Sequence, residues 1–149
     1  MRRAEETPGG WVWRGTLPVH RRFLMKSHRL SLGRWGEWLA LVHLRRLGWD
    51  IVARNWRTRE GEVDLIAYDG PYLVFVEVKT RRLDPDRERS AQHNFNSRKG
   101  RKMEVLALAF CRRHSLMDVP FRLDLVAIET TNRRDFELTH YILPERVVG

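Results

Sequence analysis

The sequence has a single cysteine, Cys111, and no run of about 18 apolar residues that is free of charge. One cysteine allows neither an internal disulfide nor a cysteine-based zinc site. The six histidines show no metal-ligand spacing, so each is expected on the surface or in the core. No apolar run follows Arg2 and Arg3, which argues against a secretory signal. Together these absences indicate a cytoplasmic protein with no membrane partner.

Acidic residues are scarce relative to basic ones. The chain has 19 Asp and Glu against 28 Lys and Arg, which gives a formal net charge of +9 and a pI near 10.7. A basic excess of this size favours a polyanionic partner, most often nucleic acid. The alternative is an Arg-rich surface that is simply solvated, and charge alone does not choose between the two.

Residues 1–30 differ from the rest of the chain. Pro and Gly break any period there, while several Arg supply charge, so this stretch is expected to be a flexible basic arm. Met25 is an alternative start, because the sequence that follows it reads as a complete small domain. We therefore expect one folded domain over residues 31–149, a length sufficient for a hydrophobic core.

Apolar periodicity over residues 31–149 alternates between helix and strand. A period near 3.6 predicts helices over 32–47 and 98–114. Shorter apolar runs bounded by turns predict strands over 51–58, 61–67, 73–79, 121–130 and 136–143, with a polar loop over 81–97. This order of one helix, three strands, one helix and two strands predicts an α/β domain with a mixed sheet.

Two of these strands carry carboxylates inside apolar runs. An Asp69-Gly70-Pro71-Tyr72 turn would place Asp64 opposite Glu77 and Glu62 opposite Lys79 in an antiparallel ladder. Side-chain alternation then predicts one apolar face and one polar face, with these four residues on the polar face. Opposed carboxylates repel each other unless a cation lies between them.

A hard divalent cation would resolve this repulsion. Mg²⁺ commonly takes one or two protein carboxylates and completes its shell with waters and phosphate oxygens. Lys79, on the same face as Glu77, could orient or deprotonate a water, or stabilise charge on the phosphate in the transition state. In a basic protein this arrangement indicates metal-assisted phosphodiester hydrolysis. The alternative is a solvated polar face whose ion pairs contribute about 0–1 kcal/mol each.

Several motifs in fixed order resemble a known family. They are Gly33-Arg34-x-Gly36-Glu37, Arg54-Asn55-x-Arg57, Gly61-Glu62-Val63-Asp64-Leu65-Ile66-Ala67 and Val74-Phe75-Val76-Glu77-Val78-Lys79-Thr80-Arg81. Across residues 31–130 the chain is similar to the YraN family of small bacterial proteins. That family resembles archaeal Holliday-junction resolvases of the PD-(D/E)XK nuclease superfamily. The resemblance implies a restriction-endonuclease-like α/β fold, with a mixed β-sheet flanked by helices.

The resemblance also implies roles for individual residues. Asp64 and Glu77 would be metal ligands, Lys79 the catalytic lysine, and Glu37 a further acidic contributor to catalysis. Periodicity alone leaves Glu37 either facing inward at the edge of the core or on the surface of the helix start. Glu62 is left as a partner for Lys79 or a neighbouring Arg. A further residue, Asp124, is expected to be structural.

The function that the resemblance implies is that of a Mg²⁺- or Mn²⁺-dependent DNA endonuclease, with branched or otherwise structured DNA as a candidate substrate. Resolvases usually work as dimers, so a homodimer is implied as well. The basic residues expected to contact nucleic acid are Arg34, Arg57, Arg81, Arg82, Arg98, Lys99 and Lys102. Two alternatives stay open: a nuclease fold kept as a non-catalytic nucleic-acid-binding or assembly module, and an enzyme that acts on RNA.

Overall fold

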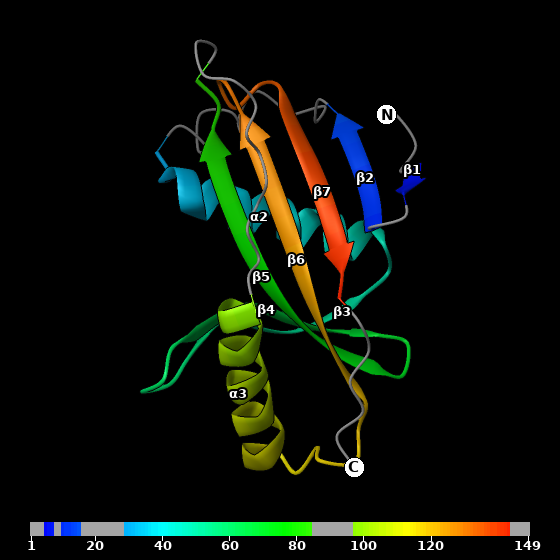
Figure 1. Cartoon of the computed structure of the whole chain (residues 1–149). Helices are drawn as coiled ribbons and strands as arrows, with labels where there is room; N and C mark the ends of the chain where they lie inside the picture. The colour runs from blue at the N-terminus through cyan, green and yellow to red at the C-terminus, as the bar shows by residue number, and fades with distance from the viewer. Residues whose placement is uncertain (1–4, 8–9, 16–28, 85–96, 144–149) are drawn as a thin grey trace.

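The computed structural model describes residues 5–7, 10–15, 29–84 and 97–143. Its strands form one seven-stranded sheet in the order β1-β2-β7-β6-β5-β4-β3 (Figure 1). β5 and β6 pair in parallel and all other neighbours pair antiparallel, so the sheet is mixed. The elements in chain order are β1 (Glu5–Thr7), β2 (Gly10–Gly15), α2 (Leu32–Arg46), β3 (Asp50–Arg57), β4 (Glu62–Asp69), β5 (Tyr72–Arg82), α3 (Ser97–Arg113), β6 (Phe121–Thr130) and β7 (Phe136–Ile142).

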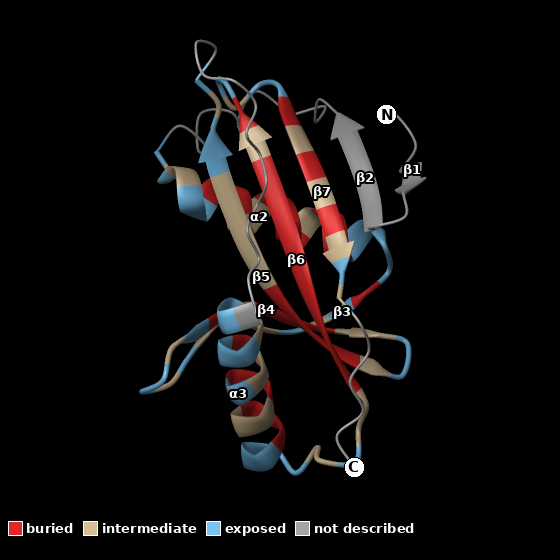
Figure 2. Ribbon diagram, in the orientation of Figure 1, coloured by how far each residue is buried: buried red, intermediate tan, exposed pale blue. Residues whose placement is uncertain are grey.

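Helices cover both faces of the sheet. α2 packs its apolar stripe, which includes Leu39 and Leu44, on one face and forms a first core. α3 packs Leu106 and Phe110 on the other face and forms a second core. Between the two, β6 is buried along nearly its whole length (Figure 2). This architecture confirms the expected restriction-endonuclease-like α/β fold. Neither of these helices is long and apolar enough to cross a membrane.

The start of α2 shows why this helix packs closely on the sheet. The Ser31 side chain caps the helix by accepting a hydrogen bond from the backbone N–H of Arg34 at 3.3 Å. One turn later stands Gly36, where an added Cβ would collide with the side chain of Thr80 of β5. Only glycine therefore permits this approach. The next residue, Glu37, is thereby brought close to the sheet.

The β4–β5 hairpin has the predicted turn but not the predicted faces. Its ladder runs from Leu65 opposite Val76 to Asp69 opposite Tyr72, which confirms the register over this span. Ile66, which regular alternation would place on the polar face with Asp64, is instead fully buried against α3. The prediction of one apolar and one polar face is therefore wrong. A sheet with helices on both faces buries both sets of alternating side chains.

The structure departs from the arm expected over residues 1–30. β1 and β2 pair with each other, and β2 pairs with β7 at the edge of the sheet. An extended segment can add there because an edge strand presents unpaired backbone donors and acceptors. The remainder of the expected arm up to residue 28, including Met25 as a start, lies outside the described residues. The predicted loop over 81–97 also differs, because β5 continues to Arg82; residues 85–96 lie outside the described part.

A chain of buried polar side chains links α2, β7, β6 and the β4–β5 turn. His43 Nε2 lies 2.9 Å from His140 Nδ1, and His140 Nε2 lies 2.7 Å from Asp124 Oδ2. Arg122 donates from Nε to Asp124 Oδ1 at 2.8 Å and from a terminal nitrogen to Asp69 Oδ2 at 3.0 Å. Asp124 and His140 have no exposed surface. The structural role expected for Asp124 is therefore confirmed, and the two histidines belong to the core.

The buried His43 makes stability depend on pH. Burial, followed by His140 and the charge of Arg46, lowers the pKa of His43 to about 3. In the unfolded chain a histidine has a pKa of about 6.5. Between these values the unfolded chain binds a proton that the folded chain does not. We therefore expect the free energy of unfolding to fall as the pH drops below about 6.5, by at most about 1.4 kcal/mol per pH unit from this residue.

Urea unfolding of the protein and of His43→Gln between pH 5 and 8 checks this expectation. The variant lacks the imidazole that titrates in the unfolded chain, so its stability should change less with pH over this interval. Equal pH slopes for the two proteins would show that His43 does not take up a proton on unfolding.

Candidate metal centre

Asp64 lies where the regular alternation of β4 is broken. Val63 packs into the α3 core, whereas Leu65 packs into the α2 core on the opposite face. In a regular strand, residues two apart share a face. The predicted alternation, which would put Val63 and Leu65 together on the apolar face, is therefore wrong here, and the change of face occurs at Asp64.

The side chain of Asp64 accepts a hydrogen bond from the backbone of β5 beyond the end of the β4–β5 ladder. The β4–β5 ladder ends at the pair of Leu65 and Val76. Beyond it, Asp64 Oδ2 accepts a hydrogen bond from the backbone N–H of Val78 at 2.8 Å. The ladder therefore does not extend to the predicted pairs of Asp64 with Glu77 and of Glu62 with Lys79.

Glu62 lies instead opposite Arg57 of β3. The two side chains form an ion pair with 2.8 Å between Arg57 Nε and Glu62 Oε2. This agrees with the expectation of a neighbouring Arg as the partner of Glu62. β4 lies between β3 and β5. Arg57 of β3 therefore contacts Glu62 from one side, and the backbone of β5 contacts Asp64 from the other.

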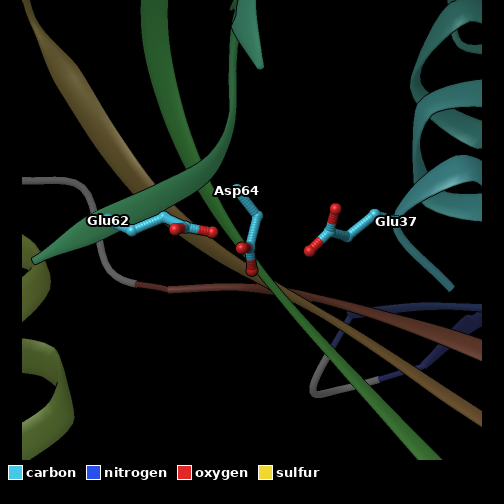
Figure 3. A group of neighbouring side chains, drawn as sticks. All are labelled: Glu37, Glu62 and Asp64. Atoms are coloured by element: carbon cyan, nitrogen blue, oxygen red, sulfur yellow. The ribbon is translucent and has the colours of Figure 1, made fainter. Parts of the chain in front are cut away.

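Three carboxylates converge at this point. Oxygens of Glu37, Glu62 and Asp64 all lie within 4.8 Å of one another. Asp64 lies between the other two, with Glu37 reaching from α2 and Glu62 from β4 (Figure 3). The structure thus brings Glu37 and Asp64 together, as the family resemblance implies, and adds Glu62. The signal that identifies Glu62 is its i, i+2 spacing from Asp64, which places both on one side of an extended strand.

Mutual repulsion and burial disfavour the ionised state of this group. Burial raises the pKa of Asp64 to about 7, and the charges of Glu77, Glu37 and Glu62 add to the effect against the opposing hydrogen bond from Val78. Burial and the charge of Glu62 also raise the pKa of Glu37. At Asp64 and Glu37, burial and repulsion therefore outweigh the neighbouring donors and cations that favour the charged form.

The donor set fits a hard divalent cation. All three side chains offer carboxylate oxygens, the ligand type that Mg²⁺ and Mn²⁺ prefer. A divalent charge would offset the repulsion that raises the pKa of Asp64 and Glu37. The one thiol of the chain, Cys111, is buried in the α3 core and offers no soft ligand here.

Glu77 and Lys79 form an ion pair on β5, next to Asp64. Lys79 Nζ lies 2.9 Å from Glu77 Oε1, and the two side chains are 44% and 22% exposed respectively. The charge of Glu77 contributes to the raised pKa of Asp64, and the next residue, Val78, donates its backbone N–H to Asp64. The structure therefore places the acids and the lysine of the family motif in one region, with Glu77 engaged by Lys79.

The seven basic residues expected to contact nucleic acid are all exposed. They come from the start of α2, the end of β3, the end of β5 and the first turns of α3, which lie on one side of the molecule (Figure 1). Lys102 of α3 reaches the β3–β4 turn, where a Cβ added at Gly61 would lie 3.0 Å from its Cε. Positive side chains thus lie at the ends of several elements on one side of the molecule, and Arg57 contacts Glu62 of the carboxylate group.

Comparisons with known proteins agree with the motifs. The family described as "Uncharacterised protein family UPF0102" matches residues 36–128. A UPF0102 protein of Roseiflexus castenholzii is 43% identical over 105 residues, which cover 70% of this chain and 83% of the relative. One of Rhodococcus opacus is 45% identical over 102 residues, 68% of this chain and 85% of the relative. One of Herpetosiphon aurantiacus is 36% identical over 121 residues, 78% of this chain and 95% of the relative. The chain therefore belongs to UPF0102, which is the YraN family.

Proposed function

We propose that this protein is a Mg²⁺- or Mn²⁺-dependent endonuclease that hydrolyses phosphodiester bonds in DNA, with branched or otherwise structured DNA as its substrate. The observation that carries the proposal is the convergence of Glu37, Glu62 and Asp64 within 4.8 Å, beside the ion pair of Glu77 and Lys79. Grouped carboxylates with a raised pKa cost stability, and such groups occur preferentially at functional sites.

Each side chain has its own role in the proposed reaction. Glu37, Glu62 and Asp64 would hold the ion, and Glu77 lies next to Asp64 in the position that the family motif implies for a ligand. When bound, the ion supplies Lewis acidity toward the phosphate and lowers the pKa of a neighbouring water. Lys79 donates hydrogen bonds to the phosphate and stabilises the negative charge that develops on its oxygens. Glu77 Oε1, at 2.9 Å, keeps Lys79 Nζ in place.

The basic surface would bind the substrate. The seven exposed Arg and Lys attract phosphates and position the duplex without reading its sequence. Paired cuts in a branched substrate require two sites, so the proposed enzyme acts as a homodimer. The logarithm of DNA affinity should fall by about 0.9 per phosphate contact for each tenfold rise in salt.

The test combines metal binding with cleavage. Purified protein is titrated with Mn²⁺ in a calorimeter and then incubated with a four-way junction, a flap, linear duplex, single-stranded DNA and structured RNA, with and without Mg²⁺ or Mn²⁺. We expect saturable Mn²⁺ binding and metal-dependent cleavage of a branched DNA. Asp118→Asn, which removes an exposed carboxylate from the segment between α3 and β6, is a control expected to behave as wild type.

Other outcomes would contradict the proposal in distinct ways. Salt-sensitive DNA binding without Mn²⁺ binding or product would indicate a nucleic-acid-binding module on a nuclease fold. Cleavage of the RNA alone would retain the metal chemistry and overturn the substrate. Loss of cleavage in Asp118→Asn would show that activity is not determined by the cluster of Glu37, Glu62 and Asp64, because Asp118 lies outside that cluster.

A further inference from the structure

The backbone of Asn55 is unusual and lies directly beside the carboxylates. Its φ is 48°, a left-handed value that is uncommon outside glycine and for which Asn is several-fold enriched. Asn55 belongs to β3, the edge strand of the sheet. The neighbouring pairs of the ladder are Arg54 with Leu65 and Trp56 with Val63, so Asn55 stands across from Asp64.

The irregularities at Asn55 and Asp64 match. On β3, Ala53 and Trp56 both pack toward α3, and on β4 their partners Ile66 and Val63 do the same. Each of these pairs is three residues apart, whereas residues on one face of a regular strand are two or four apart. Both strands therefore change face at the same level, while the register between them stays constant from Ala53 to Arg57. The left-handed conformation of Asn55 accommodates this on β3.

The side chain of Asn55 reaches the carboxylate group. Hydrogen bonding of its amide to the carboxylate of Glu37 on α2 opposes the rise in the pKa of that carboxylate. An amide has no charge, so it satisfies one acceptor position of Glu37 and leaves the negative charge available to a cation. A Lys or Arg at the same place would neutralise that charge and repel a divalent ion.

We propose that Asn55 is a positioning residue for the metal centre: its left-handed backbone directs a neutral amide onto Glu37 and holds that carboxylate against Glu62 and Asp64. The inference rests on the proposed function and deepens it. Groups that orient a metal ligand typically change metal affinity by about 10–100-fold when they are lost. The alternative is that Asn55 serves only to accommodate the left-handed backbone at this position of β3.

Asn55→Gly separates the two roles of this residue. Glycine adopts the left-handed conformation readily, so the variant keeps the backbone and loses only the amide. We expect Asn55→Gly to fold and to bind Mn²⁺ about 10-fold more weakly than wild type, measured by calorimetry. Ser115→Gly makes the same kind of change at another positive φ, 55°, in the turn after α3. It should bind Mn²⁺ as wild type does.

A double-mutant cycle shows whether Asn55 acts through Glu37. In Glu37→Ala, which has no carboxylate to orient, adding Asn55→Gly should change Mn²⁺ affinity by less than about 2-fold. An equal loss in both backgrounds, or unchanged Mn²⁺ binding by Asn55→Gly, would overturn the positioning role while leaving the proposed function intact. Failure of the wild type to bind Mn²⁺ would overturn both.

Discussion

Replacing Asp124 with Ala is expected to lower the free energy of unfolding by about 3–5 kcal/mol, because removing one partner of a buried ion pair leaves the other charge uncompensated. Arg122, only 8% exposed, donates two hydrogen bonds to this carboxylate, and His140, with no exposed surface, lies 2.7 Å from it. The remaining partner of Arg122 is Asp69, on the partly exposed turn. Chemical unfolding at pH 7.5 measures the change.

A graded series keeps this prediction informative if Asp124→Ala does not fold. Asp69→Ala removes the more exposed partner of the same guanidinium, 38% exposed, and should cost about 1 kcal/mol or less. Arg122 would then still contact Asp124 and lie over the ring of Trp49 at 5.2 Å. Asp118→Ala is the control at an exposed site. A folded Asp124→Ala within about 1 kcal/mol of wild type would show that the network contributes little to stability.

The sequence predicts the frame of this protein well, because the frame depends on local patterns. Apolar periodicity gives the two helices, and the Asp69-Gly70-Pro71-Tyr72 turn gives the register of the hairpin from Leu65 to Asp69. Both are properties of neighbouring residues. The family motifs then give the fold class and the presence of Glu37 near Asp64.

The details that the sequence does not predict depend on contacts between distant segments. His43 and His140 are 97 positions apart, and neither position shows a spacing that suggests their contact. The change of face at Asp64 lies across from a left-handed Asn55 in the neighbouring strand, and strict alternation predicts neither. Alternation does place Glu62 on the face of Asp64, but the family resemblance gives Glu62 no role in the site. In the structure Glu62 contacts Arg57 and its oxygens also lie near those of Glu37 and Asp64.

Asp64→Asn should abolish metal-dependent cleavage and weaken Mn²⁺ binding by at least about 100-fold, since loss even of a group that orients a ligand costs about 10–100-fold. The same change should raise the melting temperature of the metal-free protein by a few degrees. Burial and the charges of Glu77, Glu37 and Glu62 make an ionised Asp64 unfavourable, and an amide removes that charge while its oxygen can still accept the N–H of Val78. Higher stability with lost binding is the result expected of a binding site and not of a structural ion pair.

Two further variants separate the carboxylates within the same experiment. Glu62→Gln should weaken Mn²⁺ binding, because its oxygens lie within 4.8 Å of those of Glu37 and Asp64. Glu77→Gln should reduce cleavage more than Mn²⁺ affinity, because Glu77 is held at 2.9 Å by Lys79. The reverse ranking would assign Glu77 to the ion, as the family motif implies, and Glu62 to Arg57. If Asp64→Asn binds Mn²⁺ like wild type, or if Asp118→Asn loses it equally, the convergence of carboxylates at β4 does not form the metal centre.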